Sequence, residues 1–206
     1  MMTLPKFENP NITTKQLLAE QKRLHAQAGK MLATTKLSDT FARYGKISTN
    51  GSYDYGLMVY PDLDMGVAAP NVSRQDFARL VGDLAGSPFV RKIGTADTVN
   101  FPPVHADRPK GYWLGLEIPF EDDRWGVDIW LQTPEWATAD NGDRYKERLA
   151  QLDERQIAAV LAIKYHLIRK GLYDAARFRS VHVYDAVLNH GVLSFDDFVG
   201  LHPVDG

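Results

Sequence analysis

The strongest constraint on the fold comes from two segments, 112–120 and 124–131, in which apolar residues alternate with other types. Alternation with a period of two is typical of half-buried β-strands. The polar stretch Glu121–Arg124 predicts a turn, so the two segments together predict a β-hairpin. A turn centred on this stretch pairs Glu117 with Asp128 on the more polar face. The same register sends three residues to the opposite face, which we expect to be buried: Val127, Ile129 and Leu131.

A second segment, residues 51–65, combines small residues with acidic ones. It begins with Gly51 and Ser52 and contains Asp62 and Asp64 near its end. Successive side chains of a strand point to opposite faces, so Asp62 and Asp64 are expected on one face, about 7 Å apart. Two carboxylates on one face, beside a turn of small residues, are able to hold Mg²⁺ against a triphosphate. The segment therefore indicates a class of reaction and leaves the acceptor open.

Asp128 supplies a third acid, placed in an otherwise apolar strand between Val127 and Ile129. An isolated buried carboxylate is costly unless it is paired or bound to a metal. The alternative is that the Gly-Ser pair and the Asp-x-Asp triplet form an ordinary solvated turn, a combination that also arises by chance. The third acid favours a functional site over that alternative.

The composition narrows the function classes. The chain has 206 residues, 44% of them hydrophobic and 24% charged, as expected for a globular protein with a sizeable core. The formal net charge of −2 and the absence of a long basic run argue against a nucleic-acid partner. With no cysteine, thiol nucleophiles, disulfides and thiolate metal sites are excluded. No segment is apolar over the roughly 20 residues of a membrane span, and we expect a cytoplasmic protein.

The remaining segments predict mainly helices. We expect an α+β part over residues 1–135 and a helical part over residues 136–206 packed against it. Expected helices and turns of helix cover 14–32, 38–44, 53–60, 74–85 and 180–189, with a further helix-rich region over 141–171. Further strands are expected over 46–49, 62–68 and 89–93, and a loop over 94–110.

The order of these motifs resembles the nucleotidyltransferase superfamily typified by DNA polymerase β. The resemblance covers about residues 36–132: the pair Gly51-Ser52, a spacer, the triplet Asp62-Leu63-Asp64, and the later acid Asp128. The spacer ends in Pro-Asp rather than the commoner Ser-Asp. The size and layout are similar to those of small bacterial members such as antibiotic adenylyltransferases. The resemblance implies a mixed sheet with flanking helices, followed by a helical C-terminal region.

The resemblance also implies roles for these residues. Asp62, Asp64 and Asp128 would ligate two Mg²⁺ ions, and Asp128 would help to remove the proton from the acceptor hydroxyl. Gly51 would let the backbone approach the phosphates of the NTP, and Ser52 would donate hydrogen bonds to them. Glu117 is a possible auxiliary acid beside Asp128, or merely part of a solvated face.

Lys164 is a further candidate, because it lies at the centre of the apolar face of a predicted helix. Either its ammonium contacts a phosphate of the nucleotide, or its stem extends past the rim of the core to solvent. The next helix carries Tyr184 and Asp185, which either contact base or acceptor or belong to the core. Four tryptophans form either a base-stacking platform or part of the core: Trp113, Trp125, Trp130 and Trp136.

We therefore expect a Mg²⁺-dependent nucleotidyltransferase that moves a nucleoside monophosphate, most simply AMP from ATP, to a hydroxyl of a small-molecule acceptor. One alternative keeps the chemistry and changes the acceptor to a protein or an RNA end. Another is a nucleotide-binding protein that keeps the fold without turnover. The histidines lack the spacing of a zinc site.

Overall fold

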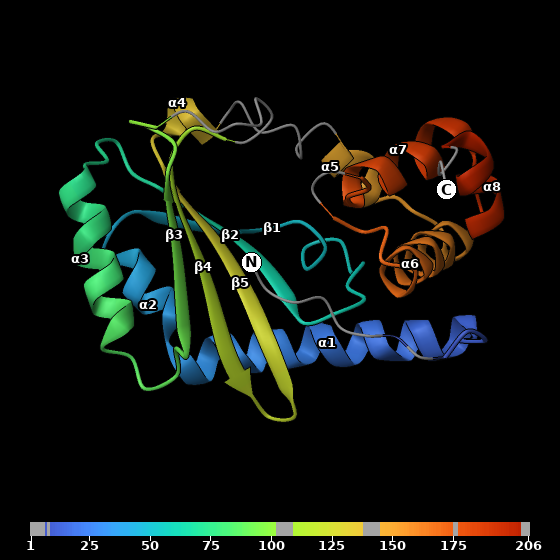
Figure 1. Ribbon diagram of the computed structural model, residues 1–206, viewed down its shortest axis with the longest axis horizontal. Coiled ribbons are helices and arrows are strands. Elements are labelled where there is room, and N and C mark those ends of the chain that lie inside the picture. Colours follow the sequence, from blue (N-terminus) through green and yellow to red (C-terminus); the bar gives the residue numbers. More distant parts are fainter. Residues whose placement is uncertain (1–6, 8, 102–108, 138–144, 175–176, 203–206) are drawn as a thin grey trace. The chain divides into compact units, whose positions relative to one another are not determined.

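The computed structural model describes residues 7, 9–101, 109–137, 145–174 and 177–202 (Figure 1). The chain divides into two compact units. One, the sheet unit, contains Ala26–Asp54 and Pro61–Asn141, and the other, the helical unit, contains Thr3–His25, Tyr55–Tyr60 and Gly142–Gly206. The sequence-based division at residue 135 assigned the first two segments of the helical unit to the α+β part. Within the described residues, no helix is both long and apolar enough to cross a membrane.

The described strands of the sheet unit form one mixed five-stranded sheet in the order β1-β2-β5-β4-β3 (Figure 1). Strands β2 and β5 run parallel, and the other neighbouring pairs are antiparallel. This confirms the predicted α+β class with a mixed sheet. The strand bounds are β1 Lys46–Asn50, β2 Asp62–Ala68, β3 Lys92–Asp97, β4 Tyr112–Phe120 and β5 Asp123–Gln132.

One face of the sheet is apolar because alternate residues of its central strands are apolar. In β2, Leu63, Met65 and Val67 are at most 1% exposed. Helices α2 and α3 pack on this side (Figure 1). The ring of Phe77 in α3 stacks on Tyr112 of β4, with the ring centres 4.8 Å apart. The helices of this unit are α2 Leu37–Ala42, α3 Arg74–Ala85, α4 Pro134–Ala137 and the C-terminal part of α1 Thr14–Thr35.

Helix α3 begins where its sequence predicts. The Ser73 side chain accepts a hydrogen bond from the Asp76 backbone N–H, and the Asp76 carboxylate accepts one from the Ser73 backbone N–H. This reciprocal capping box satisfies two N–H groups at the start of the helix.

The helical unit is built around its own core. Residues Ala159, Val160, Ile163 and Leu167 of one helix pack with Val183, Ala186 and Val187 of another, and all are buried. The helices are α5 Lys146–Leu149, α6 Glu154–Arg169, α7 Ser180–His190 and α8 Phe195–Leu201. Segment 53–60, predicted to contain a turn of helix, forms turns and bends instead.

Candidate functional site

The three predicted acids share one face of the sheet. In the parallel register of β2 and β5, Asp64 is the direct partner of Asp128, and Asp62 is the partner of Gly126. Directly paired residues of neighbouring strands point to the same face, and such strands lie about 4.8 Å apart. The register therefore sets Asp64 and Asp128 side by side, with Asp62 two residues earlier on the same face.

The alternation of β2 and β5 fixes which face the acids occupy. Their neighbours Leu63, Val127 and Ile129 are completely buried on the helix-covered face. The acids therefore lie on the opposite face, where Asp64 is exposed and Asp62 and Asp128 are half-buried. This arrangement reduces the cost of a carboxylate inside an apolar strand, because the carboxylate remains partly hydrated.

Gly51 and Ser52 form the turn that follows β1, next to this face. Asn50, the last residue of β1, is the direct partner of Asp64. Gly51 has φ +67°, and a Cβ atom on it would lie 2.5 Å from Oδ2 of Asp64. The position therefore requires glycine twice over, for its left-handed backbone and for the close approach to the carboxylate. Further along the turn, the Thr49 hydroxyl donates to Asp54 Oδ1 at 2.6 Å.

The predicted pairing of Glu117 with Asp128 is wrong. The hairpin turn consists of Glu121 and Asp122 alone, so Glu117 is opposite Gly126, and Gly115 is opposite Asp128. Glu117 accepts a hydrogen bond from Arg91 Nη1 at 2.8 Å in a salt bridge across the sheet. Glu117 keeps the predicted face, but a different residue lies beside Asp128.

The turn also contacts a helix outside the hairpin. Glu121 has φ 52°, and its carboxylate accepts hydrogen bonds from Gln27 and Lys30 of α1. Glu121 therefore has a left-handed backbone, which usually favours glycine, and its side chain contacts α1.

Lys164 lies in the core of the helical unit and is 1% exposed. Its Nζ donates to the Leu57 carbonyl oxygen at 2.7 Å and lies 6.0 Å from the centre of the Tyr184 ring. The expected alternative in which the stem extends to solvent is therefore wrong. The predicted contact with a nucleotide stays a prediction. Tyr184 is itself buried, and Asp185 accepts a hydrogen bond from Tyr145.

The four tryptophans do not form one platform. Trp125 is fully buried on the helix-covered face. Trp113 and Trp130 are half-buried direct partners in β4 and β5, on the face that carries the acids. Trp136 lies in α4, where Lys110 Nζ is 5.0 Å from its ring.

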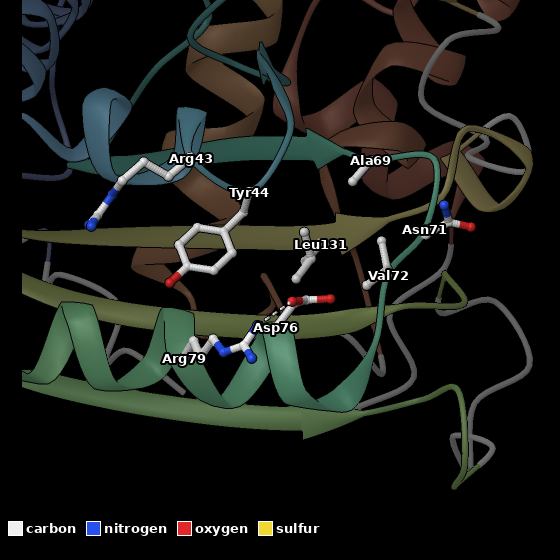
Figure 2. Close-up of a pocket in the computed structure, with 8 residues that line it drawn as sticks. All are labelled: Arg43, Tyr44, Ala69, Asn71, Val72, Asp76, Arg79 and Leu131. Carbon is white, nitrogen blue, oxygen red and sulfur yellow. Dashed lines mark hydrogen bonds and ion pairs between the residues drawn. The ribbon is translucent and has the colours of Figure 1, made fainter.

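A pocket of about 370 Å³ lies away from the acids (Figure 2). Leu131 lines it, and this residue is three positions from Asp128 in β5, so their side chains point to opposite faces. Two of its charged residues, Asp76 and Arg79, form a salt bridge at 3.2 Å. The other lining residues are Arg43, Tyr44, Ala69, Asn71 and Val72.

The donor set suits magnesium bound together with a substrate. Among the described residues, no three His, Asp or Glu side chains form a group that could hold a metal ion. Mg²⁺ is usually bound by one or two carboxylates together with waters and substrate phosphates, rather than by an all-protein cage. The adjacent carboxylates of Asp64 and Asp128 match that arrangement, and Asp62 adds a third oxygen donor group on the same face.

Solved structures show the same fold. No protein-family model and no curated protein matches the chain. The non-canonical poly(A) polymerase complex GLD-2–GLD-3 matches at a TM-score of 0.54 and 19% identity, covering 93% of this chain and 56% of that one. A cytoplasmic RNA terminal U-transferase matches at a TM-score of 0.57 and 15% identity, covering 85% and 54%.

The Cid1 poly(U) polymerase, solved with Mg and 3′-dATP, matches at a TM-score of 0.59 and 17% identity, covering 86% and 54%. The chain thus spans about half the length of these proteins. The resemblance predicted from the sequence motif is confirmed at the level of the fold, which the chain shares with these poly(A) and poly(U) polymerases.

Proposed function

We propose that this chain is a Mg²⁺-dependent nucleotidyltransferase that transfers a nucleoside monophosphate from an NTP to a terminal hydroxyl of RNA. The observation that carries the proposal is the direct pairing of Asp64 with Asp128, with Asp62 on the same face and Gly51 against the Asp64 carboxylate. The similarity to RNA-tailing polymerases supports RNA as the acceptor.

Each residue has a role that its position allows. The three aspartates would hold Mg²⁺, which stabilises the charge on the entering and leaving oxygens when bound. Asp128 would accept the proton of the attacking hydroxyl. The Gly51 backbone lies against the Asp64 carboxylate, and the backbone N–H groups of this turn and the Ser52 hydroxyl would donate to the triphosphate.

A small molecule is a second candidate for the acceptor. The net charge of −2 favours a small-molecule acceptor over a polyanion, as the sequence predicts. Incubation with each α-labelled NTP, Mg²⁺, and either a short RNA or a panel of small hydroxyl compounds separates the two. Label on RNA extended by one or more nucleotides supports the RNA acceptor, whereas label only on small molecules would refute it.

The metal assignment is tested by substitution. Asp64→Asn and Asp128→Asn should each lower the transfer rate by at least about a hundredfold, because metal stabilisation is worth several kcal/mol. The matched control is Glu117→Gln, on the same face but opposite Gly126, which should keep most of the activity. Near-normal turnover in either aspartate variant would refute the site.

Thermal melting of the protein with NTP and Mg²⁺ together, and with each alone, detects a protein that binds the nucleotide without turnover.

A further inference from the structure

Two glycines lie beside Asp128 across the sheet, one on each of the next two strands. Gly115 of β4 is the direct partner of Asp128, and Gly94 of β3 is the direct partner of Gly115. The sheet therefore has no side chain at two successive positions beside the acid. Glycine inside a strand often marks a place where another group approaches the backbone closely.

The group that approaches here is the indole of Trp113. A Cβ atom on Gly115 would lie 2.6 Å from Cζ2 and 2.7 Å from Cη2 of Trp113. A Cβ atom on Gly94 would lie 3.5 Å from Cζ3 of the same ring. The six-membered ring thus occupies the space above both glycines.

Trp113 leans toward the acid, whereas its partner Trp130 leans away. The Cβ position of Gly115 that meets the Trp113 ring is also 3.3 Å from Oδ1 of Asp128. Trp130 instead lies beside Gly111, whose Cβ position is 3.3 Å from Cε3 of Trp130. The Trp113 indole therefore lies close to the Asp128 carboxylate, and Trp113 is partly exposed.

Two basic residues lie at the start of β3, beside Glu117 and two positions or more along the chain from Gly94. The Arg91 side chain is 54% exposed although it forms the salt bridge with Glu117, and Lys92 is exposed and is the direct partner of Glu117. An aromatic ring with basic side chains nearby is the usual combination in sites for single-stranded nucleic acid, because bases stack and phosphates are attracted.

From this geometry we infer that Trp113 is the stacking surface for the terminal base of the acceptor RNA. This inference rests on the proposed function and names how that site selects its acceptor. Stacking of the terminal base on the indole would leave its ribose beside Asp128, the group proposed to accept the hydroxyl proton. Trp113 would then favour an acceptor that ends in a planar base over one that lacks it.

The test compares two short oligoadenylates, one with an intact terminal base and one with an abasic terminal ribose. For the intact acceptor, Trp113→Ala should raise KM by roughly 5- to 150-fold, the range for loss of one base–aromatic stack. Trp113→Phe should restore most of the affinity. The KM for the NTP and the KM for the abasic acceptor should change little. Trp130→Phe is the matched control and should behave as the wild type.

Two results would overturn the inference while the enzyme remains active: an unchanged acceptor KM in Trp113→Ala, or an equal rise for the intact and abasic acceptors. Binding is also measured without turnover, by quenching of tryptophan fluorescence with the intact oligoadenylate. Quenching that is lost in Trp113→Phe supports the stack, and equal quenching in both proteins refutes it. If the wild type transfers no nucleotide to any acceptor, the proposed function fails, and the quenching still decides the stack.

Discussion

The backbone of Gly51 lies directly against the carboxylate of Asp64, so close that a Cβ atom on Gly51 would be 2.5 Å from Oδ2. We predict that Gly51→Ala displaces this carboxylate and removes most of the transfer activity. The left-handed backbone should add a stability cost of about 1–2 kcal/mol. Steady-state transfer assays and urea unfolding measure the two effects separately.

Gly56→Ala is the control for the backbone effect. Gly56 has φ +63°, and its Cβ position meets the side chain of Gln21 at 3.2 Å rather than an acid. Both variants should lose similar stability, and only Gly51→Ala should lose activity beyond what unfolding explains. Equal activity in the two variants would contradict the role of the Gly51–Asp64 contact.

The residues of the candidate site could be predicted from the sequence because their signals are local. The alternation in β2 and β5 determines which face each acid occupies, and strand β2 runs over the predicted residues, Asp62–Ala68. The pairing of Glu117 could not be predicted in the same way. It depends on the left-handed backbone of Glu121. No glycine marks this position in the sequence, and the Glu121 carboxylate accepts a hydrogen bond from Gln27 of α1.

The bounds of strand β3 could not be predicted correctly from the sequence either. The prediction placed a strand at 89–93, whereas β3 covers Lys92–Asp97. Its glycine and short side chains, Gly94 and Ala96, carry little hydrophobic signal. The pairing of β3 with β4 explains the small residue at position 94, because Gly94 lies under the Trp113 ring. The position of the Trp113 ring above Gly94 and Gly115 could therefore not be predicted from the sequence alone.

Gly115→Ala should destabilise the protein by about 1–3 kcal/mol, the usual cost of overpacking. Its new methyl group would overlap the Trp113 ring, so the indole or the strand would have to shift. Gly94→Ala is the control, since its methyl would make ordinary contact at 3.5 Å. Thermal and urea unfolding of the pair check this, and equal stability of the two variants would count against the observed indole position.

Lys164→Met should lower the free energy of unfolding by about 1–3 kcal/mol, because the buried Leu57 carbonyl loses a charged donor. Lys15→Met, at an exposed position, should stay within about 0.5 kcal/mol of the wild type. The KM for the NTP should be measured on the same variants. A large rise in that KM with unchanged stability would mean that Lys164 serves the nucleotide and not the core.

His166 should make the stability of the protein depend on pH. Burial, together with the positive charges of Arg169 and Lys170, lowers the pKa of His166 from its usual 6.5, and Asp196 opposes this only in part. The folded protein therefore resists protonation that the unfolded chain accepts. The associated stability is present above pH 6.5 and is lost as the pH falls through the lower pKa of the folded state.

His166→Gln removes the titrating group and should flatten this part of the curve of unfolding free energy against pH. Urea unfolding at several values between about pH 5 and pH 8 measures it. The His166 ring lies 5.4 Å from the Phe195 ring, so the substitution also removes a packing contact and should lower stability at every pH. The test therefore compares the slopes of unfolding free energy against pH. A His166→Gln curve parallel to that of the wild type would show that this histidine does not control the pH dependence.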